Sequence, residues 1–259
     1  MTLDFGLEGR RALVTGAGQG VGEGIAHTLA SAGADVVVND YYAERAEIVA
    51  HAIVAAGGRA SAAAFDVTDH AGVQNAVAGA GHVDILVNNA GNAGTDGFGA
   101  LAPFVDTNPD EWTKYLDVNL RGVMNCVHAA LPAMIEAKWG RVITMVSDAA
   151  RTGDAQMAAY SAAKAGAAGF CRAIASEVAR HGVTVNNVAL GTMRTPLTAG
   201  LWDDPTKVEQ QRALMSGYLV RRPGEPDDAA WIVATLASPR AAWITGQTIP
   251  VNGGRSFTL

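Results

Sequence analysis

Hydrophobic residues along the chain fall into short, continuous runs rich in Val and Ile, and longer segments of helical periodicity separate these runs. Little polar alternation interrupts the runs, which is typical of strands covered on both faces. In the first helical segment Val21, Ile25 and Leu29 recur at i, i+4 and i+8, and Gly33 follows as a C-terminal cap. The runs predict strands at Ala12–Thr15, Val36–Asn39, Ala60–Phe65, Ile85–Asn88, Arg141–Ser147, Thr184–Val188 and Thr248–Val251.

The alternation of strand and helix predicts the α/β fold class. We expect a single Rossmann-like domain over residues 1–259, in which a doubly wound parallel β-sheet of about seven strands is flanked by helices. Asn108 followed by Pro109 predicts a helix start, with an N-cap residue and Pro at the first helical position. Residues 192–222 fit the alternation least well and are expected to form a lid or binding segment over the strand ends.

Composition and charge narrow the class of protein. The 19 basic and 25 acidic residues leave a net charge of −6, which does not favour nucleic acid or an anionic membrane as partner. Cys126 and Cys171 lie in apolar helical stretches and the His residues form no close pair, so neither disulfides nor a metal site is expected. No apolar run is long enough to span a membrane, and Met1–Gly9 lacks the basic start of a signal peptide. A cytoplasmic protein is therefore expected.

Glycine is in excess, at 30 of 259 residues, and part of the excess follows the first predicted strand. The segment 15–22 reads T-G-A-G-Q-G-V-G and opens a helix, an arrangement that seats a pyrophosphate on a helix N-terminus. The strict G-x-G-x-x-G spacing is not met, and no Gly-Lys pair follows as in a Walker A loop. The turn predicts a dinucleotide site whose contacts are Gly16, Gln19, Gly20, Val21 and Gly22.

Asp40 lies 20 residues after Gly20, directly after the second predicted strand. A carboxylate there accepts hydrogen bonds from the adenosine ribose hydroxyls and repels a 2′-phosphate, which predicts NAD(H) rather than NADP(H). Asp40 also has the side chain to cap the next helix, and both roles are compatible. Arg45, one helical turn further on, is interpreted as a solvated helix charge.

Tyr160 and Lys164 stand at i and i+4 in a helical segment, so their polar groups share one helix face. A free Tyr has a pKa of ~10, and a neighbouring cation favours the phenolate that a general base requires. Ser147 ends the strand predicted at Arg141–Ser147, at the carboxyl edge where open parallel sheets bind ligands. These residues predict an acid/base site beside the dinucleotide crevice.

These motifs together resemble the short-chain dehydrogenase/reductase family over nearly the whole chain. The resemblance rests on T-G-x-x-x-G-x-G at 15–22, Asp66-Val67, N-N-A-G at 88–91, Asn119, Ser147, Tyr160-x-x-x-Lys164 and T-G-Q at 245–247. It implies an NAD-dependent oxidoreductase that interconverts a secondary alcohol and a ketone, with Tyr160 as general acid/base. Lys164 would lower the pKa of Tyr160 and hold the nicotinamide ribose, and Ser147 would bind the substrate oxygen.

The resemblance also assigns further roles. Asn119 would help to hold a water that leads protons away from Lys164, and the family implies a homo-oligomer, a tetramer or a dimer. Further cofactor contacts would come from Asp66, Val67, Asn88, Ala90, Gly91, Gly191 and Thr195.

Two residues depart from the family pattern. Leu190 precedes Gly191 where the family usually has Pro, and Asp148 follows Ser147 where a small residue is common. Asp148 has two alternative roles, a contact with substrate or an ion pair with Arg151.

The expected substrate wall is mostly apolar and favours a hydrophobic alicyclic or hydroxyacyl substrate. A hydroxyacyl-CoA is included, because basic residues of the lid could meet its phosphates. The expected wall residues are Asn92, Ala93, Met157, Leu190, Met193, Leu197, Leu201 and Trp202, and the basic residues are Lys207, Arg212, Arg221 and Arg222. Two other functions stay open, an NADPH-dependent 3-oxoacyl thioester reductase and a non-catalytic NAD(H)-binding regulatory protein.

Overall fold

The computed structural model describes residues 5–91 and 101–257, and in these residues a single seven-stranded sheet forms the centre of one domain. The strand order is β3-β2-β1-β4-β5-β6-β7, and every neighbouring pair is parallel. The strands are β1 (Arg11–Val14), β2 (Asp35–Asp40), β3 (Arg59–Ala64), β4 (Ile85–Asn88), β5 (Gly140–Ser147), β6 (Val183–Leu190) and β7 (Thr248–Val251). Each predicted strand is confirmed, and so is the doubly wound parallel architecture.

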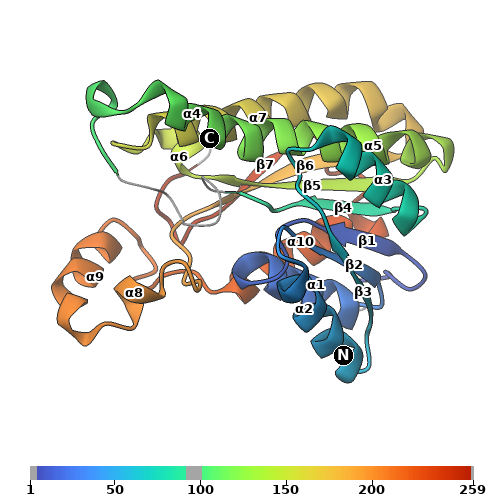
Figure 1. Ribbon diagram of the computed structural model, residues 1–259, viewed down its shortest axis with the longest axis horizontal. Coiled ribbons are helices and arrows are strands. Elements are labelled where there is room, and N and C mark those ends of the chain that lie inside the picture. Colours follow the sequence, from blue (N-terminus) through green and yellow to red (C-terminus); the bar gives the residue numbers. More distant parts are fainter. Residues whose placement is uncertain (1–4, 92–100, 258–259) are drawn as a thin grey trace.

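Helices cover both faces of the sheet (Figure 1). One face carries α1 (Gly20–Ser31), α2 (Ala43–Ala55) and α10 (Pro226–Ala237), with Ile25, Leu29 and Val233 in its buried core. The opposite face carries α3 (His70–Ala80), α5 (Gly122–Glu136) and α7 (Ala158–Val178), with Cys126 and Cys171 as buried free thiols. The remaining elements are the helices α4 (Pro109–Leu116), α6 (Ala149–Thr152), α8 (Ala199–Trp202) and α9 (Val208–Met215), the π-helical turn η2 (Asp117–Arg121), and the 3-10 helices η1 (Phe104–Asp106), η3 (Ala179–His181), η4 (Pro205–Lys207) and η5 (Pro239–Ala241).

The predicted helix ends are confirmed where capping residues mark them. The Asn108 side chain accepts a hydrogen bond from the Asp110 N–H, and Pro109 is the first residue of α4. α1 ends at Ser31, and Gly33 beyond it has φ of +99°, a conformation that favours glycine.

The strand order reverses at β1, since the chain builds β2 and β3 on one side and then returns to place β4 on the other. The carboxyl ends of β1 and β4 therefore border the crevice where open α/β sheets bind ligands. Ser147 ends β5 at the same edge, where it pairs in register with Leu190 of β6.

Segment 192–222, predicted to be a lid and called the lid below, contains α8, η4 and α9, which lie away from the sheet (orange in Figure 1). Met193 anchors its start, because Met193 forms a parallel bridge with Gly224 and packs into the core beneath α1 and α10. No helix in the described part of the chain is long and apolar enough to cross a membrane. Residues 5–91 and 101–257 hold no group of three His, Cys, Asp or Glu side chains suited to a metal ion.

Candidate active site

Side chains from two neighbouring strands hold the glycine turn after β1. The Asn89 Nδ2 group donates to the carbonyls of Thr15 and Gly16, at 3.0 and 2.9 Å. The Gly16 N–H donates to Asn39 Oδ1 at 3.3 Å, and the Gly18 N–H donates to Asp40 Oδ2 at 3.1 Å. The turn is therefore built into the ends of β2 and β4 and does not depend on a ligand for its shape.

Close packing explains why glycines occupy this turn. A Cβ on Gly16 would lie 2.8 Å from the Ala90 Cα atom, and one on Gly22 would lie 2.3 Å from the Gly16 carbonyl oxygen. Gly20 has φ of +62°, and a Cβ there would lie 3.4 Å from Thr195 of the lid. The glycines thus allow the backbone to pack against β4 and the lid, and they leave the N-terminus of α1 at the crevice.

Tyr42 is the N-cap residue of α2 and no side chain caps that helix, so the predicted capping role of Asp40 is wrong. Asp40 is buried at the end of β2 and binds the backbone of two segments. Its Oδ1 atom accepts from the Tyr42 N–H at 3.0 Å, while Oδ2 accepts from the Gly18 N–H. Arg45 lies closer to the turn than expected, because a Cβ on Gly18 would meet its Cβ at 2.6 Å. The Arg45 guanidinium stacks over the Tyr42 ring, 4.5 Å from its centroid. Interpreting Arg45 as a solvated charge was therefore incomplete.

Asn88 and Asn89 face opposite sides of the sheet. Asn88 is buried, its Nδ2 group donates to Thr144 Oγ1 at 3.2 Å, and its Oδ1 atom has no partner. Sequence analysis assigned the cofactor edge to Asn88 and Ala90, whereas Asn89 holds the glycine turn. The alternation of side chains along a strand was the signal that separates them.

Gly91, Asn119 and Lys164 converge at the end of β4. A Cβ on Gly91 would lie 3.0 Å from Lys164 Nζ and 3.1 Å from Asn119 Oδ1. Asn119 is fully buried in the π-helical turn η2, and its Nδ2 group donates to the Tyr115 carbonyl at 2.9 Å. π-Helical turns occur frequently at functional sites, and this one brings the Asn119 side chain beside Lys164.

Tyr160 and Ser147 meet by a side-chain hydrogen bond. Burial raises the pKa of Tyr160 to about 12, and the bond with Ser147 opposes that rise. The lowering of this pKa by Lys164 that the resemblance implies stays a prediction, because Lys164 is not among the groups that shift the pKa of Tyr160 here. The Lys164 Nζ atom lies 5.9 Å from the Tyr160 ring centroid and donates instead to the Met145 carbonyl at 2.8 Å.

Lys164 is itself destabilised as a cation. It is 4% exposed, and burial lowers its pKa to about 8. At neutral pH the ammonium is kept by a small margin, so a proton can leave Lys164 far more readily than it leaves a solvated lysine.

Asp148 is buried and serves as the centre of a polar network. Its Oδ1 atom accepts from Arg151 Nη1 at 2.7 Å and from the Ser256 hydroxyl at 2.8 Å, and Oδ2 accepts from Asn252 Nδ2 at 3.1 Å. The ion pair with Arg151 is confirmed as the role of Asp148. The network also ties the segment after β7 to the residue that follows Ser147.

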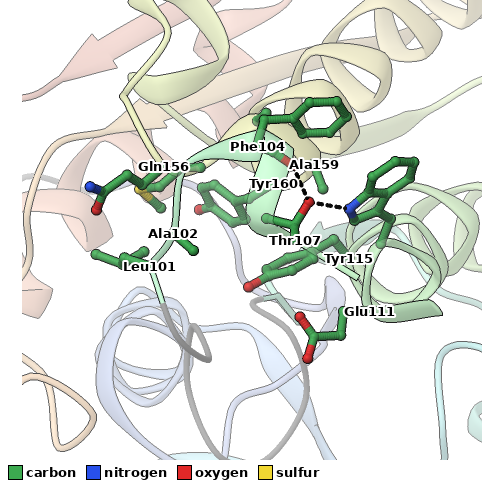
Figure 2. A pocket seen from close by; sticks show the side chains of 12 residues that line it. Leu101, Ala102, Phe104, Thr107, Glu111, Tyr115, Gln156, Ala159 and Tyr160 are labelled. Carbon is green, nitrogen blue, oxygen red and sulfur yellow. Dashed lines mark hydrogen bonds between the residues drawn. The ribbon is translucent and has the colours of Figure 1, made fainter. Parts of the chain in front are cut away.

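A pocket lies between the segment 101–115 and the start of α7, and Tyr160 forms part of its wall (Figure 2). Tyr115 stands 6.3 Å from Tyr160 between ring centroids, and Phe104 stacks on Trp112 at 4.9 Å. Thr107 fixes this wall, since its hydroxyl accepts from Trp112 Nε1 and donates to the Phe104 carbonyl. The lining residues are Leu101, Ala102, Phe104, Thr107, Glu111, Trp112, Tyr115, Gln156, Met157, Ala158, Ala159 and Tyr160.

Of the expected substrate wall, Met157 lines this pocket and Met193 does not. Met193 is 8% exposed and packs with its sulfur against Gly224, so it belongs to the core. Leu190 stands beside Ser147 but packs against the core beneath α1 and α10. Leu197, Leu201 and Trp202 do not line this pocket, and Asn92 and Ala93 lie outside the described residues. Sequence analysis missed the aromatic wall of segment 101–115.

The remaining predicted cofactor residues lie near the crevice but have structural partners of their own. Asp66 Oδ1 accepts from the Thr68 N–H and hydroxyl, and Val67 is buried against Gly122. The Gly191 N–H donates to the Val251 carbonyl, so Gly191 extends the sheet. The N–H of Thr195, the lid residue nearest the turn, donates to the Thr198 hydroxyl at 2.9 Å.

The residues at the crevice fit a nicotinamide dinucleotide. A preformed turn at a helix N-terminus suits the pyrophosphate, and Gly91 leaves Lys164 and Asn119 uncovered by a side chain at that point. The orphaned Asn88 Oδ1 atom lies at the same end of β4. Fold and site define an α/β oxidoreductase of the type that uses this cofactor.

Comparison with known proteins agrees with this class. The model of the short chain dehydrogenase family matches residues 10–206, and the chain belongs to the short-chain dehydrogenase/reductase family. It is 38% identical to the (2S)-[(R)-hydroxy(phenyl)methyl]succinyl-CoA dehydrogenase subunit BbsD of Thauera aromatica, over 98% of this chain and 99% of that protein. It is also 38% identical to the 3-oxoacyl-[acyl-carrier-protein] reductase FabG of Escherichia coli strain K12, over 96% of this chain and 98% of that protein.

Solved structures show the same fold. A gluconate 5-dehydrogenase from Burkholderia cenocepacia J2315, in complex with NADP and tartrate, matches with a TM-score of 0.88 and 34% identity. The match covers 99% of this chain and 98% of that one. The relatives act on different substrates and one holds NADP, so the family membership leaves the substrate and the choice of dinucleotide to the residues of this chain.

Proposed function

We propose that this chain is an NAD-dependent dehydrogenase that interconverts an apolar secondary alcohol and its ketone. The observation that carries the proposal is the position of Tyr160, which forms part of the pocket wall and hydrogen-bonds Ser147. A substrate oxygen placed between these two hydroxyls receives a hydrogen bond from Ser147 and exchanges a proton with Tyr160. When bound, the nicotinamide supplies the acceptor or donor of hydride.

The residues of the chain handle the proton. With a pKa of about 12, the Tyr160 phenol is protonated at neutral pH and is ready to donate to a carbonyl oxygen. In the oxidation direction the phenolate needs a cation, and Lys164 is the buried cation one helical turn away. Asn119, packed beside Lys164, is the group we propose to hold the water that relays this proton.

Asp40 supports NAD over NADP. Its buried carboxylate stands at the end of β2, where a 2′-phosphate would meet a negative charge. Arg45 is the nearby cation that could favour NADP, but its guanidinium is engaged over Tyr42. We expect kcat/KM for NAD⁺ to exceed that for NADP⁺ at least tenfold, and equal values would favour the NADPH-dependent 3-oxoacyl thioester reductase.

The pocket supports a substrate with an apolar body more than a CoA thioester. Each basic residue of the lid already has a partner, as Lys207 with Asp204 and Arg212 with Glu209 show. Arg222 pairs with Asp228, and Arg221 donates to the carbonyls of Met215 and Ser216. A homo-oligomer and a cytoplasmic location, as in the sequence analysis, stay part of the proposal.

A panel of secondary alcohols, read by NADH absorbance, tests the proposal. The panel holds alicyclic alcohols, 1-phenylethanol, a hydroxyacyl-CoA and gluconate, and we expect turnover of the first two. Tyr160→Phe is expected to lower kcat by about 10³-fold or more while NADH binding, read by fluorescence, persists. Activity retained in Tyr160→Phe would remove Tyr160 as the acid/base. NADH binding without turnover of any alcohol would favour the non-catalytic regulatory protein.

A further inference from the structure

The wall of the pocket opposite Tyr160 carries one charge. Among the described lining residues Glu111 is the ionisable carboxylate, and no Lys, Arg or His lines the pocket. The rest of this wall is aromatic or aliphatic, with Phe104, Trp112 and Tyr115 as its largest side chains. A ligand that enters therefore meets ring faces and a negative charge.

Glu111 and Tyr115 act at the same end of the pocket. Their spacing of i and i+4 on α4 places both on one helix face. Burial raises the pKa of Tyr115, and the charge of Glu111 raises it further, so the carboxylate lies close enough to act on the Tyr115 hydroxyl. Figure 2 shows the two side chains at the same side of the pocket, below the Tyr160 ring in this view.

Glu111 is exposed on α4 and is held by no ion pair from the described chain. It forms no salt bridge within residues 5–91 and 101–257, although Lys114 stands three residues further along α4. The basic residues of the lid pair with carboxylates of the lid or of α10, and Arg221 with lid carbonyls. Glu111 therefore places a negative charge on this wall of the pocket.

We propose that Glu111 is a specificity-determining residue that makes the pocket select its substrate by charge. Resting on the proposed function, the inference names the substrate class: aromatic or alicyclic secondary alcohols that carry an amine beyond the carbinol carbon, with acids rejected. The ammonium group pairs with the Glu111 carboxylate and lies against the ring faces of Tyr115 and Trp112. A carboxylate or phosphate at that position meets Glu111 with no compensating cation.

Ligand binding to the protein without cofactor tests charge selection independently of turnover. Benzylamine, benzyl alcohol and benzoate are titrated by calorimetry at low salt, and we expect affinity to fall in that order. Glu111→Gln is expected to reduce the benzylamine-to-benzoate affinity ratio by about 3- to 5-fold, and 0.5 M NaCl to reduce it similarly by screening. Asp110→Asn removes a neighbouring charge of α4 that does not line the pocket, and should leave the ratio unchanged.

Two results would overturn the inference: benzoate binding as tightly as benzylamine, or an equal loss of ratio in Asp110→Asn and Glu111→Gln. A melting temperature for each variant separates these results from unfolding.

A kinetic series separates this inference from the proposed function. The substrates are 1-phenylethanol and its para-aminomethyl and para-carboxy derivatives, with NAD⁺ in excess. The expected order of kcat/KM is amine, neutral alcohol, acid, with the spread reduced in Glu111→Gln through KM rather than kcat. If the neutral alcohol is oxidised but the acid derivative has the highest kcat/KM, the further inference is wrong and the proposed function stands. Charge-selective binding with no alcohol oxidised would contradict the proposed function and the named substrate class, and only the selection of ligands by the charge of Glu111 would stand.

Discussion

The glycine turn at 15–22 and the lid at 192–222 meet at Gly20 and Thr195, yet they are held by different kinds of contacts. The turn is fixed by side chains of β2 and by Asn89 after β4, which are distant in sequence and mostly buried. The lid is held largely by local pairs at its surface, such as Arg194 with Asp203, whose side chains are 50% and 54% exposed.

This difference separates two tasks. Hydrogen bonds shielded from solvent between distant segments are costly to break, so the contacts of the turn favour one shape. Exposed ion pairs contribute about 0–1 kcal/mol and exchange readily with water. The glycine turn, which we propose contacts the dinucleotide, is thus held rigidly. The lid, which we propose lies next to the substrate, is held loosely. Matched substitutions on the two sides test this comparison.

A Gly-to-Ala substitution in the glycine turn and one in the lid give the largest expected difference in the free energy of unfolding. Gly22→Ala places a Cβ 2.3 Å from the Gly16 carbonyl oxygen and 2.4 Å from Asn89 Nδ2, so the turn must shift. We expect a loss of about 3 kcal/mol in the free energy of unfolding, together with weaker NADH binding. Gly200→Ala, in α8 of the lid, meets nothing within 4 Å and should be neutral or stabilising by up to about 1 kcal/mol.

Urea denaturation and an NADH titration measure both effects. Equal losses in the two variants would show that the lid is packed as tightly as the turn and would remove the contrast.

Replacing Lys164, the buried lysine of the candidate active site, gives the next largest expected effect on stability. Because the folded pKa of Lys164 is about 8 and its ordinary value is 10.5, the unfolded chain binds more protons between these values. Stability contributed by this site therefore rises with pH from about 8 to 10.5 and is lowest below pH 8. The cost of holding the cation is about 3 kcal/mol at neutral pH.

Lys164→Met removes that cost and one hydrogen bond to Met145, so we expect a gain of about 2 kcal/mol at pH 7 with loss of activity. Lys207→Met in the lid, where the ammonium is half-exposed, should change stability little and should keep the activity. Thermal melts at pH 7 and pH 10 provide the measurement. A wild-type protein whose stability does not rise relative to Lys164→Met over this range would contradict the assignment.

Sequence patterns predict the rigid side of the molecule far better than the loose side. Ile85–Asn88 and Thr248–Val251 are observed with the predicted ends. Ile85–Asn88 is buried on both faces, and such strands read as uninterrupted apolar runs. The side-chain convergence of Ser147 and Tyr160 also follows from strand ends and helical spacing, which are local properties.

Residues of the pocket depend on tertiary packing that no local pattern encodes. Phe104 and Tyr115 carry no motif, and they reach Tyr160 because α4 packs against α7. Met193 lies after a strand end, like a wall residue, but a bridge to Gly224, 31 positions later, buries it. The strand patterns place the edge of the site, and the packing of separate segments decides which side chains face the substrate.

The smallest expected contrast compares two aspartates. Asp148 is buried and accepts three hydrogen bonds from Arg151, Ser256 and Asn252, whereas Asp203 pairs with Arg194 in solvent. Asp148→Asn is expected to cost about 1.5 kcal/mol, because an amide leaves Arg151 with a weaker, uncharged acceptor. Asp203→Asn is expected to cost less than about 0.5 kcal/mol.

Denaturation in low and high salt distinguishes the two sites further, since salt should abolish the effect of Asp203→Asn and leave most of that of Asp148→Asn. Because Asp148 follows Ser147, its loss should also lower kcat by a few-fold with little change in KM, if the segment after β7 holds the serine in place. An Asp148→Asn protein with unchanged stability and kcat would mean that the network does not position Ser147. The rigidly held part of the site would then include the glycine turn but not Ser147.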